Sequence, residues 1–156
     1  MKKIELGQTL TILANVGVLA GILLLVFELS QNREMMTAQT RNEISQGAIE
    51  LLTLAINDVS FQNVIRRGQF GEELSEDERW QFNGHQQAWY RYWENVHYQY
   101  RIGLFDETEF ATQKATWARS LSIHPGMVKR WCERKAGFSP EFVTEIDGLL
   151  TTYRCE

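Results

Sequence analysis

Residues 10–29 read LTILANVGVLAGILLLVFEL, and this stretch carries no charge until Glu28. In an α-helix about 20 residues span about 30 Å, which is the thickness of the hydrocarbon core of a bilayer. A surface helix of a soluble protein has a polar face, and the middle of this stretch has none. The stretch therefore predicts a helix that crosses a membrane once, so the lipid bilayer is the first predicted partner.

Two other kinds of apolar segment compete with a membrane anchor. A cleaved signal peptide has an apolar region of about 7–15 residues, followed by a small-residue cleavage site. Here the run is longer, it ends in the sequence ELSQN over residues 28–32, and no such site follows. A helix buried in a protein core is the third interpretation, and Gly17 and Gly21 make it less favourable.

The composition of the remaining chain fits one folded domain. The protein has 156 residues, so about 125 follow the anchor, which is enough for a single hydrophobic core. A formal net charge of −4 argues against nucleic acid as a partner. Only two prolines occur, Pro125 and Pro140, so long helices are permitted.

The pattern after the anchor predicts an all-α fold, because no segment alternates with period two for long enough to form a strand. Helical spacing continues to Ile56, so the anchor is expected to run on into a long helix. A short helix is predicted over 61–67, closed by Gly68. The predicted domains are an N-terminal tail and transmembrane helix (1–29), a helical extension (30–57) and a soluble helical bundle (58–156).

Local signals place the helices of this bundle. Ser75 and Glu78 have the spacing of a capping box, which opens a long helix that Gly103 ends. Asp106 is the predicted N-cap of a helix to about residue 122. Ser139 and a proline at the first helical position open the last helix, to about residue 151. Another helix is predicted over 127–136.

Small residues in the anchor predict self-association. Gly17 and Gly21 form a G-x-x-x-G pair, which lets two helix backbones approach closely in a membrane. Ala14 and Gly21 are seven residues apart, and the same step continues through Met35, Asn42, Ile49 and Ile56. Such a seam is typical of parallel helices wound around one another. The polar stretch over 31–45 weakens this pattern.

Two polar residues of the anchor allow a second interpretation. An unpaired amide in hydrocarbon is costly, so Asn15 is expected to bind a partner on a neighbouring helix. In a ring of protomers, Asn15 and Glu28 would line a pore that favours cations. The plainer interpretation of Glu28 is a carboxylate at the interface, solvated by water and head groups.

The long helix that starts at residue 76 is rich in aromatic residues. His85, Trp89, Trp93 and His97 step by four and share one stripe, which predicts either a ligand pocket or, more simply, a core helix. Glu94 and His97 have the Glu-x-x-His spacing of di-iron bundles, but the chain has no second pair. Neither a metal site nor another cofactor is expected, and no serine or cysteine lies in a nucleophile motif.

The two cysteines, Cys132 and Cys155, have no metal-binding or redox spacing. We therefore expect free thiols in a reducing compartment. The positive-inside rule does not decide the orientation, because Lys2 and Lys3 precede the anchor and Arg33 and Arg41 follow it. The thiols favour a single-pass protein of the bacterial inner membrane with a cytoplasmic C-terminal domain.

The order of these features resembles a group of uncharacterised bacterial single-pass membrane proteins with a C-terminal helical domain. The resemblance rests on the anchor followed by the segments ELSQN (28–32), AQ (38–39), WENVHYQYR (93–101), GLFDE (103–107) and FSPEF (138–142). It covers most of the chain. It implies a membrane-anchored helical domain, and it brings no activity or catalytic residue with it.

The sequence thus predicts a non-enzymatic homo-oligomer. Its anchor associates through Ala14, Asn15, Gly17 and Gly21, and its helical domain acts as a scaffold or a sensor. The alternatives are a homo-oligomeric ion channel lined by the N-terminal helices and, less favoured, a metal-dependent enzyme with its site in the bundle core.

Overall fold

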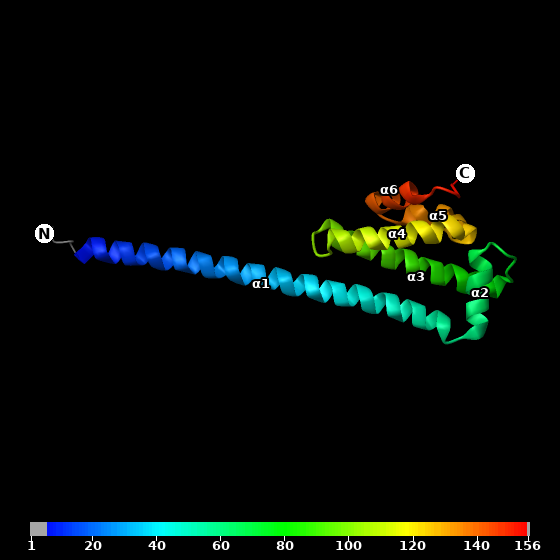
Figure 1. Ribbon diagram of the computed structural model, residues 1–156, viewed down its shortest axis with the longest axis horizontal. Coiled ribbons are helices and arrows are strands. Elements are labelled where there is room, and N and C mark those ends of the chain that lie inside the picture. The colour runs from blue at the N-terminus through cyan, green and yellow to red at the C-terminus, as the bar shows by residue number, and fades with distance from the viewer. Residues whose placement is uncertain (1–5, 156) are drawn as a thin grey trace. The chain divides into compact units, whose positions relative to one another are not determined.

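The computed structural model describes residues 6–155, with only the backbone of Leu6, and every long element in that range is an α-helix (Figure 1). The predicted all-α class is confirmed, with one long N-terminal helix followed by a small bundle. Lys2 and Lys3 of the charge comparison lie outside the described residues. The elements are α1 (Leu6–Ile56), α2 (Val59–Gln69), α3 (Glu76–Arg101), α4 (Glu107–Ile123), α5 (Pro125–Arg134), the short 3-10 helix η1 (Lys135–Gly137) and α6 (Pro140–Leu149).

The chain divides into two compact units, one ending at Gln39 and the other beginning at Thr40. The first unit is the N-terminal part of α1. Among the described residues, α1 is the one helix long and apolar enough to cross a membrane, and none of its most apolar window is buried. The second unit contains the rest of α1 and all the other helices.

Side chains cap the starts of α2, α3 and α4, whereas Ser139 before α6 makes no side-chain cap. Ser75 Oγ accepts from the Glu78 N–H at 3.3 Å while Glu78 Oε2 accepts from the Ser75 N–H at 2.9 Å, so the predicted capping box is confirmed. Asp106 caps α4 by accepting two backbone N–H groups. Gly103 follows α3 with a φ of 76°, a backbone conformation that suits glycine.

Gly68 does not close a helix as predicted, because α2 continues to Gln69. Its role is to let other groups approach. A Cβ on Gly68 would clash with the ring of Phe82 on α3, and a Cβ on Gly126 of α5 would overlap the Gly68 carbonyl group. The helices α2 and α5 therefore touch backbone to backbone at a pair of glycines, a contact that no larger residue would allow.

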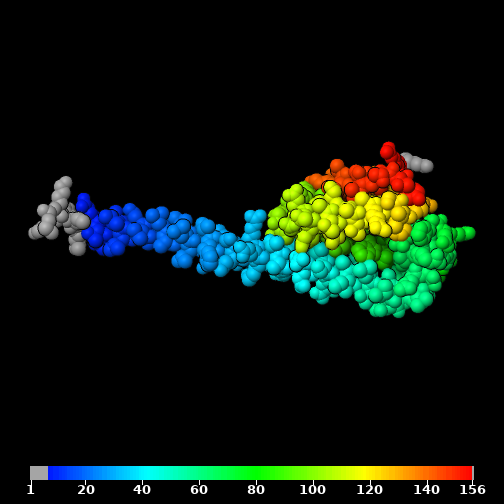
Figure 2. All heavy atoms as spheres, in the orientation of Figure 1, coloured from blue at the N-terminus to red at the C-terminus, as the bar shows by residue number. Residues whose placement is uncertain are grey.

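Aromatic rings fill the core of the second unit. Trp117, Trp131, Tyr90 and Phe142 are fully buried, and each makes ring contacts with neighbours from other helices. A smaller cluster around Phe82 joins α2 to α3. Figure 2 shows α6, in red and orange, at the surface of this unit, where it packs against α4.

The C-terminal part of α1 has one face on this core. Thr40 and Ile44 are buried, and Gly47 lies against the ring of Tyr92. Arg41 Nε donates to Glu109 Oε1 of α4 at 2.6 Å. These contacts attach residues 40–56 of α1 to the bundle.

Candidate functional site

The aromatic stripe predicted on α3 is divided between two places. His85, Trp89 and Trp93 line a cavity, whereas His97 lies elsewhere, between the rings of Phe110 and Phe142. The stripe therefore borders a cavity at its first three residues, and a ligand in that cavity stays a prediction. The simpler interpretation, a core helix, is confirmed, because Trp93 is 4% exposed and Tyr90 of the same helix is fully buried.

The cavity has a volume of about 430 Å³ and lies inside the second unit, between the end of α1 and helices α2 to α5. This volume is in the range of small-molecule sites. The part of α1 that forms one wall has small or aliphatic side chains. The lining residues are Ala48, Leu51, Leu52, Ala55, Ile65, Gln69, His85, Gln86, Trp89, Tyr92, Trp93, Gln113, Thr116, Trp117, Ser120, His124 and Met127.

Stacked and perpendicular indole and phenol rings form the aromatic wall. Trp93 of α3 stacks on Trp117 of α4, with ring centroids 5.2 Å apart and planes 16° from parallel. Trp89 meets Tyr92 edge to face at 5.6 Å. Trp117 is 1% exposed and contacts the rings of Trp93, Phe110 and Phe142, so packing fixes its position. The wall is rigid and presents flat apolar surfaces to the cavity.

His85 is the titratable residue of this wall with the largest change in pKa. Burial lowers the pKa of His85 to about 4, so its ring is neutral at pH 7. The indole Nε1–H of Trp89 donates to His85 Nε2 at 3.2 Å. Phe61 of α2 packs edge to face on the same ring, with centroids 5.5 Å apart.

Glu94 and His97, which have the spacing of a metal motif, bind separate partners. Glu94 accepts from Arg91 at 2.6 Å and from the Ser139 N–H at 2.8 Å, which fixes the start of α6. His97 Nε2 lies 4.0 Å from a carboxylate oxygen of Glu145, and burial lowers the pKa of His97. Within residues 6–155, no cluster of three or more His, Cys, Asp or Glu side chains is placed to hold a metal ion.

The predicted association residues Ala14, Asn15, Gly17 and Gly21 all lie on α1 in the first unit, as does Glu28 of the predicted pore. Gly17 and Gly21 have open space where a Cβ would stand. The anchor therefore makes no close contact within the chain at this pair of glycines. Neither the association nor the pore is decided by this arrangement, and both stay predictions.

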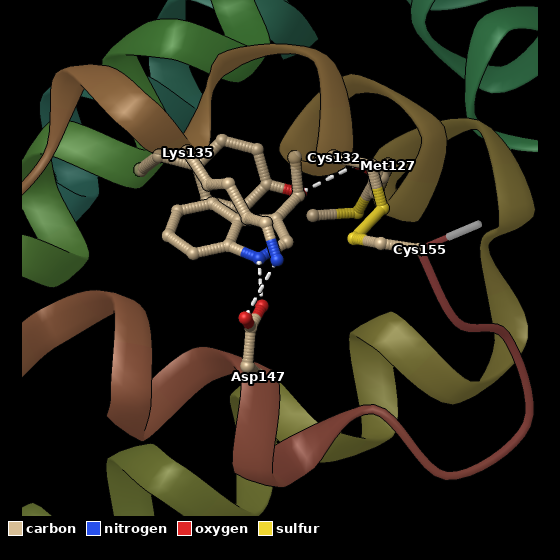
Figure 3. Close-up of a disulfide and its surroundings, with 7 residues drawn as sticks. Met127, Cys132, Lys135, Asp147 and Cys155 are labelled. Atoms are coloured by element: carbon tan, nitrogen blue, oxygen red, sulfur yellow. Dashed lines mark hydrogen bonds and ion pairs between the residues drawn. A yellow bond between two sulfur atoms is a disulfide. The ribbon is translucent and has the colours of Figure 1, made fainter.

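The expectation of free thiols is wrong. Cys132 and Cys155 form a disulfide, with their Cα atoms 5.3 Å apart (Figure 3). The bridge ties the segment after α6 to α5. Asp147 of α6 reinforces the same junction, because it accepts from Trp131 Nε1 at 2.8 Å and from Lys135 Nζ at 2.7 Å. The argument from reduced thiols to a cytoplasmic domain therefore fails.

Comparisons with protein-family models, with curated proteins and with solved structures found no match to the chain. The resemblance to bacterial single-pass membrane proteins is therefore not tested by them.

Sequence reasoning missed several polar residues of the cavity, among them Gln86, Trp117 and His124. One signal was present for Gln86, because it lies on the same helical face as Phe82 and Trp93, and an amide on an apolar face has to find a partner. Trp117 and His124 reach the cavity only through the packing of α4 on α3. Local sequence carries no signal for that contact.

Proposed function

We propose that this chain is a non-enzymatic, single-pass membrane protein that self-associates through α1 and presents its bundle as a sensing domain. The observation that carries this proposal is the outward face of α1 between residues 42 and 56. Ile49 and Ile56 are 62% and 61% exposed. These two side chains follow the seven-residue step, and the inward face of the same helix is already occupied by Thr40 and Ile44.

A second copy of α1 is the partner that best fits this exposed face. In a parallel pair of helices, residues at a seven-residue step meet their own counterparts, so Ile49 would pack on Ile49 and Ile56 on Ile56. The same step includes Ala14 and Gly21 of the anchor, where small residues allow close packing in lipid. Self-association would cover the apolar face of the extension and the glycines of the anchor with one interface.

We further propose that the anchor lies in a bacterial inner membrane and that the bundle faces the periplasm. Disulfides persist in oxidising compartments and are rare in the cytoplasm, so the Cys132–Cys155 bridge favours this side. The charges that flank the anchor do not oppose it, since two basic residues lie near each end. The first expectation, a cytoplasmic domain, rested on thiols that are not free.

Crosslinking in detergent tests the self-association. Gly17→Leu with Gly21→Leu should block close approach in the anchor, and Ile49→Glu with Ile56→Glu should disrupt the exposed face of the extension. Leu19→Ile with Leu23→Ile is the matched control, because it changes the opposite face of the anchor without changing its volume. We expect the crosslinked oligomer to decrease in the first two variants and not in the control. An oligomer that is unchanged in both would exclude α1 as its interface.

A further inference from the structure

We propose that the cavity binds a small, neutral, aromatic molecule through apolar contacts alone, and that the bound molecule fastens residues 48–55 of α1 to α3. The inference gives a ligand to the sensing part of the proposed function and rests on it only there, because the cavity lies within one chain. Three observations carry it: the loss of burial along α1, the rings of α3 and the absence of charge in the wall.

The inward face of α1 stops being buried where the cavity begins. Thr40 and Ile44 are 7% and 3% exposed. Ala48, Leu51 and Ala55 continue the same face at steps of three or four residues, but they are only half-buried and line the cavity. The face that packs on the core at Ile44 therefore meets a void of about 430 Å³ one turn later. Protein interiors contain few voids larger than a water molecule, so this space is a candidate ligand site.

A second copy of α1 does not fill this space. The stripe proposed to meet that copy contains Ile49 and Ile56, and successive positions such as Ala48 and Ile49 are about 100° apart around the helix axis. A helix that packs on the stripe therefore lies beside the cavity and not in it. Leu52 and Thr116 are the exposed lining residues, so the cavity opens to solvent between α1 and α4. A small molecule can enter there.

The wall that α3 contributes favours a flat ring. Trp89 and Tyr92 line the cavity, are half-buried and meet edge to face with ring centroids 5.6 Å apart. The indole N–H of Trp89 already donates to His85 Nε2 at 3.2 Å, so it needs no acceptor on a ligand. An aromatic ligand gains stacking or edge-to-face contacts with these rings that a saturated molecule of similar shape does not.

The wall also excludes ionic ligands. No lysine, arginine, aspartate or glutamate is among the lining residues, and burial lowers the pKa of His85 to about 4, so its ring is neutral at pH 7. An ionised group in this environment would be desolvated without a counter-charge. The α4 side contributes polar groups such as Gln113 and Ser120, whereas all the lining residues of α1 are apolar. A neutral aromatic hydrocarbon matches the α1 and α3 sides.

Three probes built on one two-ring skeleton test the proposal on the full chain in lipid nanodiscs at pH 7. They are naphthalene, its saturated analogue decalin and the charged 2-naphthoate. Gas chromatography of the headspace gives the free concentration of the two volatile probes, and equilibrium dialysis gives that of naphthoate. Empty nanodiscs give the partition of each probe into lipid, and each affinity is scaled by that partition.

Naphthalene should saturate at one molecule per chain. On the scaled measure it should bind about threefold to tenfold tighter than decalin, as expected for one or two aromatic contacts. Naphthoate should show no saturable binding. Hydrogen exchange locates the bound probe, because a ligand between α1 and α3 should slow the exchange of the backbone amides of residues 48–56.

Ala48→Phe fills the cavity from α1 and should abolish saturable binding, and Ala55→Phe does the same from a position two turns later. Thr53→Phe is the matched control, because it adds the same ring at an exposed position of α1 and should leave binding intact. Hydrogen exchange in the wild type keeps the test decisive even where neither filling variant folds.

The proposal is overturned by any of four results. These are naphthalene binding that does not saturate above empty nanodiscs, decalin or naphthoate binding as well as naphthalene, wild-type binding by a folded Ala48→Phe or Ala55→Phe variant, and unchanged exchange over residues 48–56 in the presence of naphthalene.

The same samples separate this inference from self-association. A Gly17→Leu/Gly21→Leu variant that no longer crosslinks and still binds naphthalene supports a site within one chain. A wild-type oligomer that crosslinks but binds no probe overturns the ligand and leaves the self-association standing.

Discussion

Removal of the Cys132–Cys155 bridge, by Cys132→Ser with Cys155→Ser, should destabilise the bundle strongly. The two cysteines are 23 positions apart in sequence. In the chain-entropy model, a crosslink that closes a loop of this length stabilises the folded state by about 3 kcal/mol, because it restricts the unfolded chain. The bridge also holds the segment after α6 against α5, because α6 ends at Leu149 and Cys155 lies beyond that end.

Tryptophan fluorescence during urea unfolding measures this loss in the full chain. All five tryptophans lie in the second unit, at positions 80, 89, 93, 117 and 131. The anchor of the detergent-solubilised chain therefore does not contribute to the tryptophan fluorescence. Trp131 is fully buried and precedes Cys132 directly, so it reports on the junction itself. The double variant should lose about 3 kcal/mol of unfolding free energy.

A reductant provides the matched control. It should lower the stability of the wild type to that of the double variant and should leave the double variant unchanged. Equal stability of the oxidised wild type, the reduced wild type and the variant would refute the reasoning, because it would mean that the bridge does not restrict the unfolded chain in this protein.

Two more substitutions test the packing and the buried histidine. Gly126→Ala places a Cβ on the Gly68 carbonyl and should lower the unfolding free energy by about 3 kcal/mol or more. Gly84→Ala is the control, because its Cβ meets open space within α3 and should raise the unfolding free energy by up to about 1 kcal/mol. Similar effects of the two substitutions would contradict the glycine contact. The pKa of His85 is about 4 in the folded state and 6.5 for the free side chain, so between these pH values the unfolded chain binds more protons than the folded chain. The unfolding free energy should therefore fall by up to about 3 kcal/mol as the pH decreases from 6.5 to 4. His85→Phe should remove that part of the slope in urea titrations at several pH values, and the lowered pKa values of His97 and His124 should leave the rest. An identical slope in wild type and variant would show that His85 is not buried as described.

The sequence was sufficient for features that depend on neighbouring residues. The capping box at Ser75, the N-cap at Asp106 and the stop at Gly103 each act through groups within a few positions, and all three are present. The length and apolarity of the N-terminal helix needed no tertiary contact either. These signals were enough to predict an all-α fold with a long first helix.

Features that depend on how the helices pack escaped local reasoning. Gly68 has the spacing of a helix stop, but its lack of a side chain serves the contact with Gly126, 58 positions later in the sequence. The pairing of Cys132 with Cys155 requires the chain after α6 to return to α5. The cavity likewise needs Trp117 of α4 to stack on Trp93 of α3.

The bundle is proposed to lie on the periplasmic side of the membrane, and this side determines which molecules can reach the cavity. The measurement is the redox state of the two cysteines in intact bacterial cells. Cells are quenched in acid, free thiols are blocked with N-ethylmaleimide, and the protein is then reduced and treated with a maleimide-linked polyethylene glycol that retards it on a gel. A periplasmic bundle predicts two tags per chain, at Cys132 and Cys155, that appear only after reduction. A chain without any tag after reduction would have had free thiols in the cell, and this result would contradict the oxidising location.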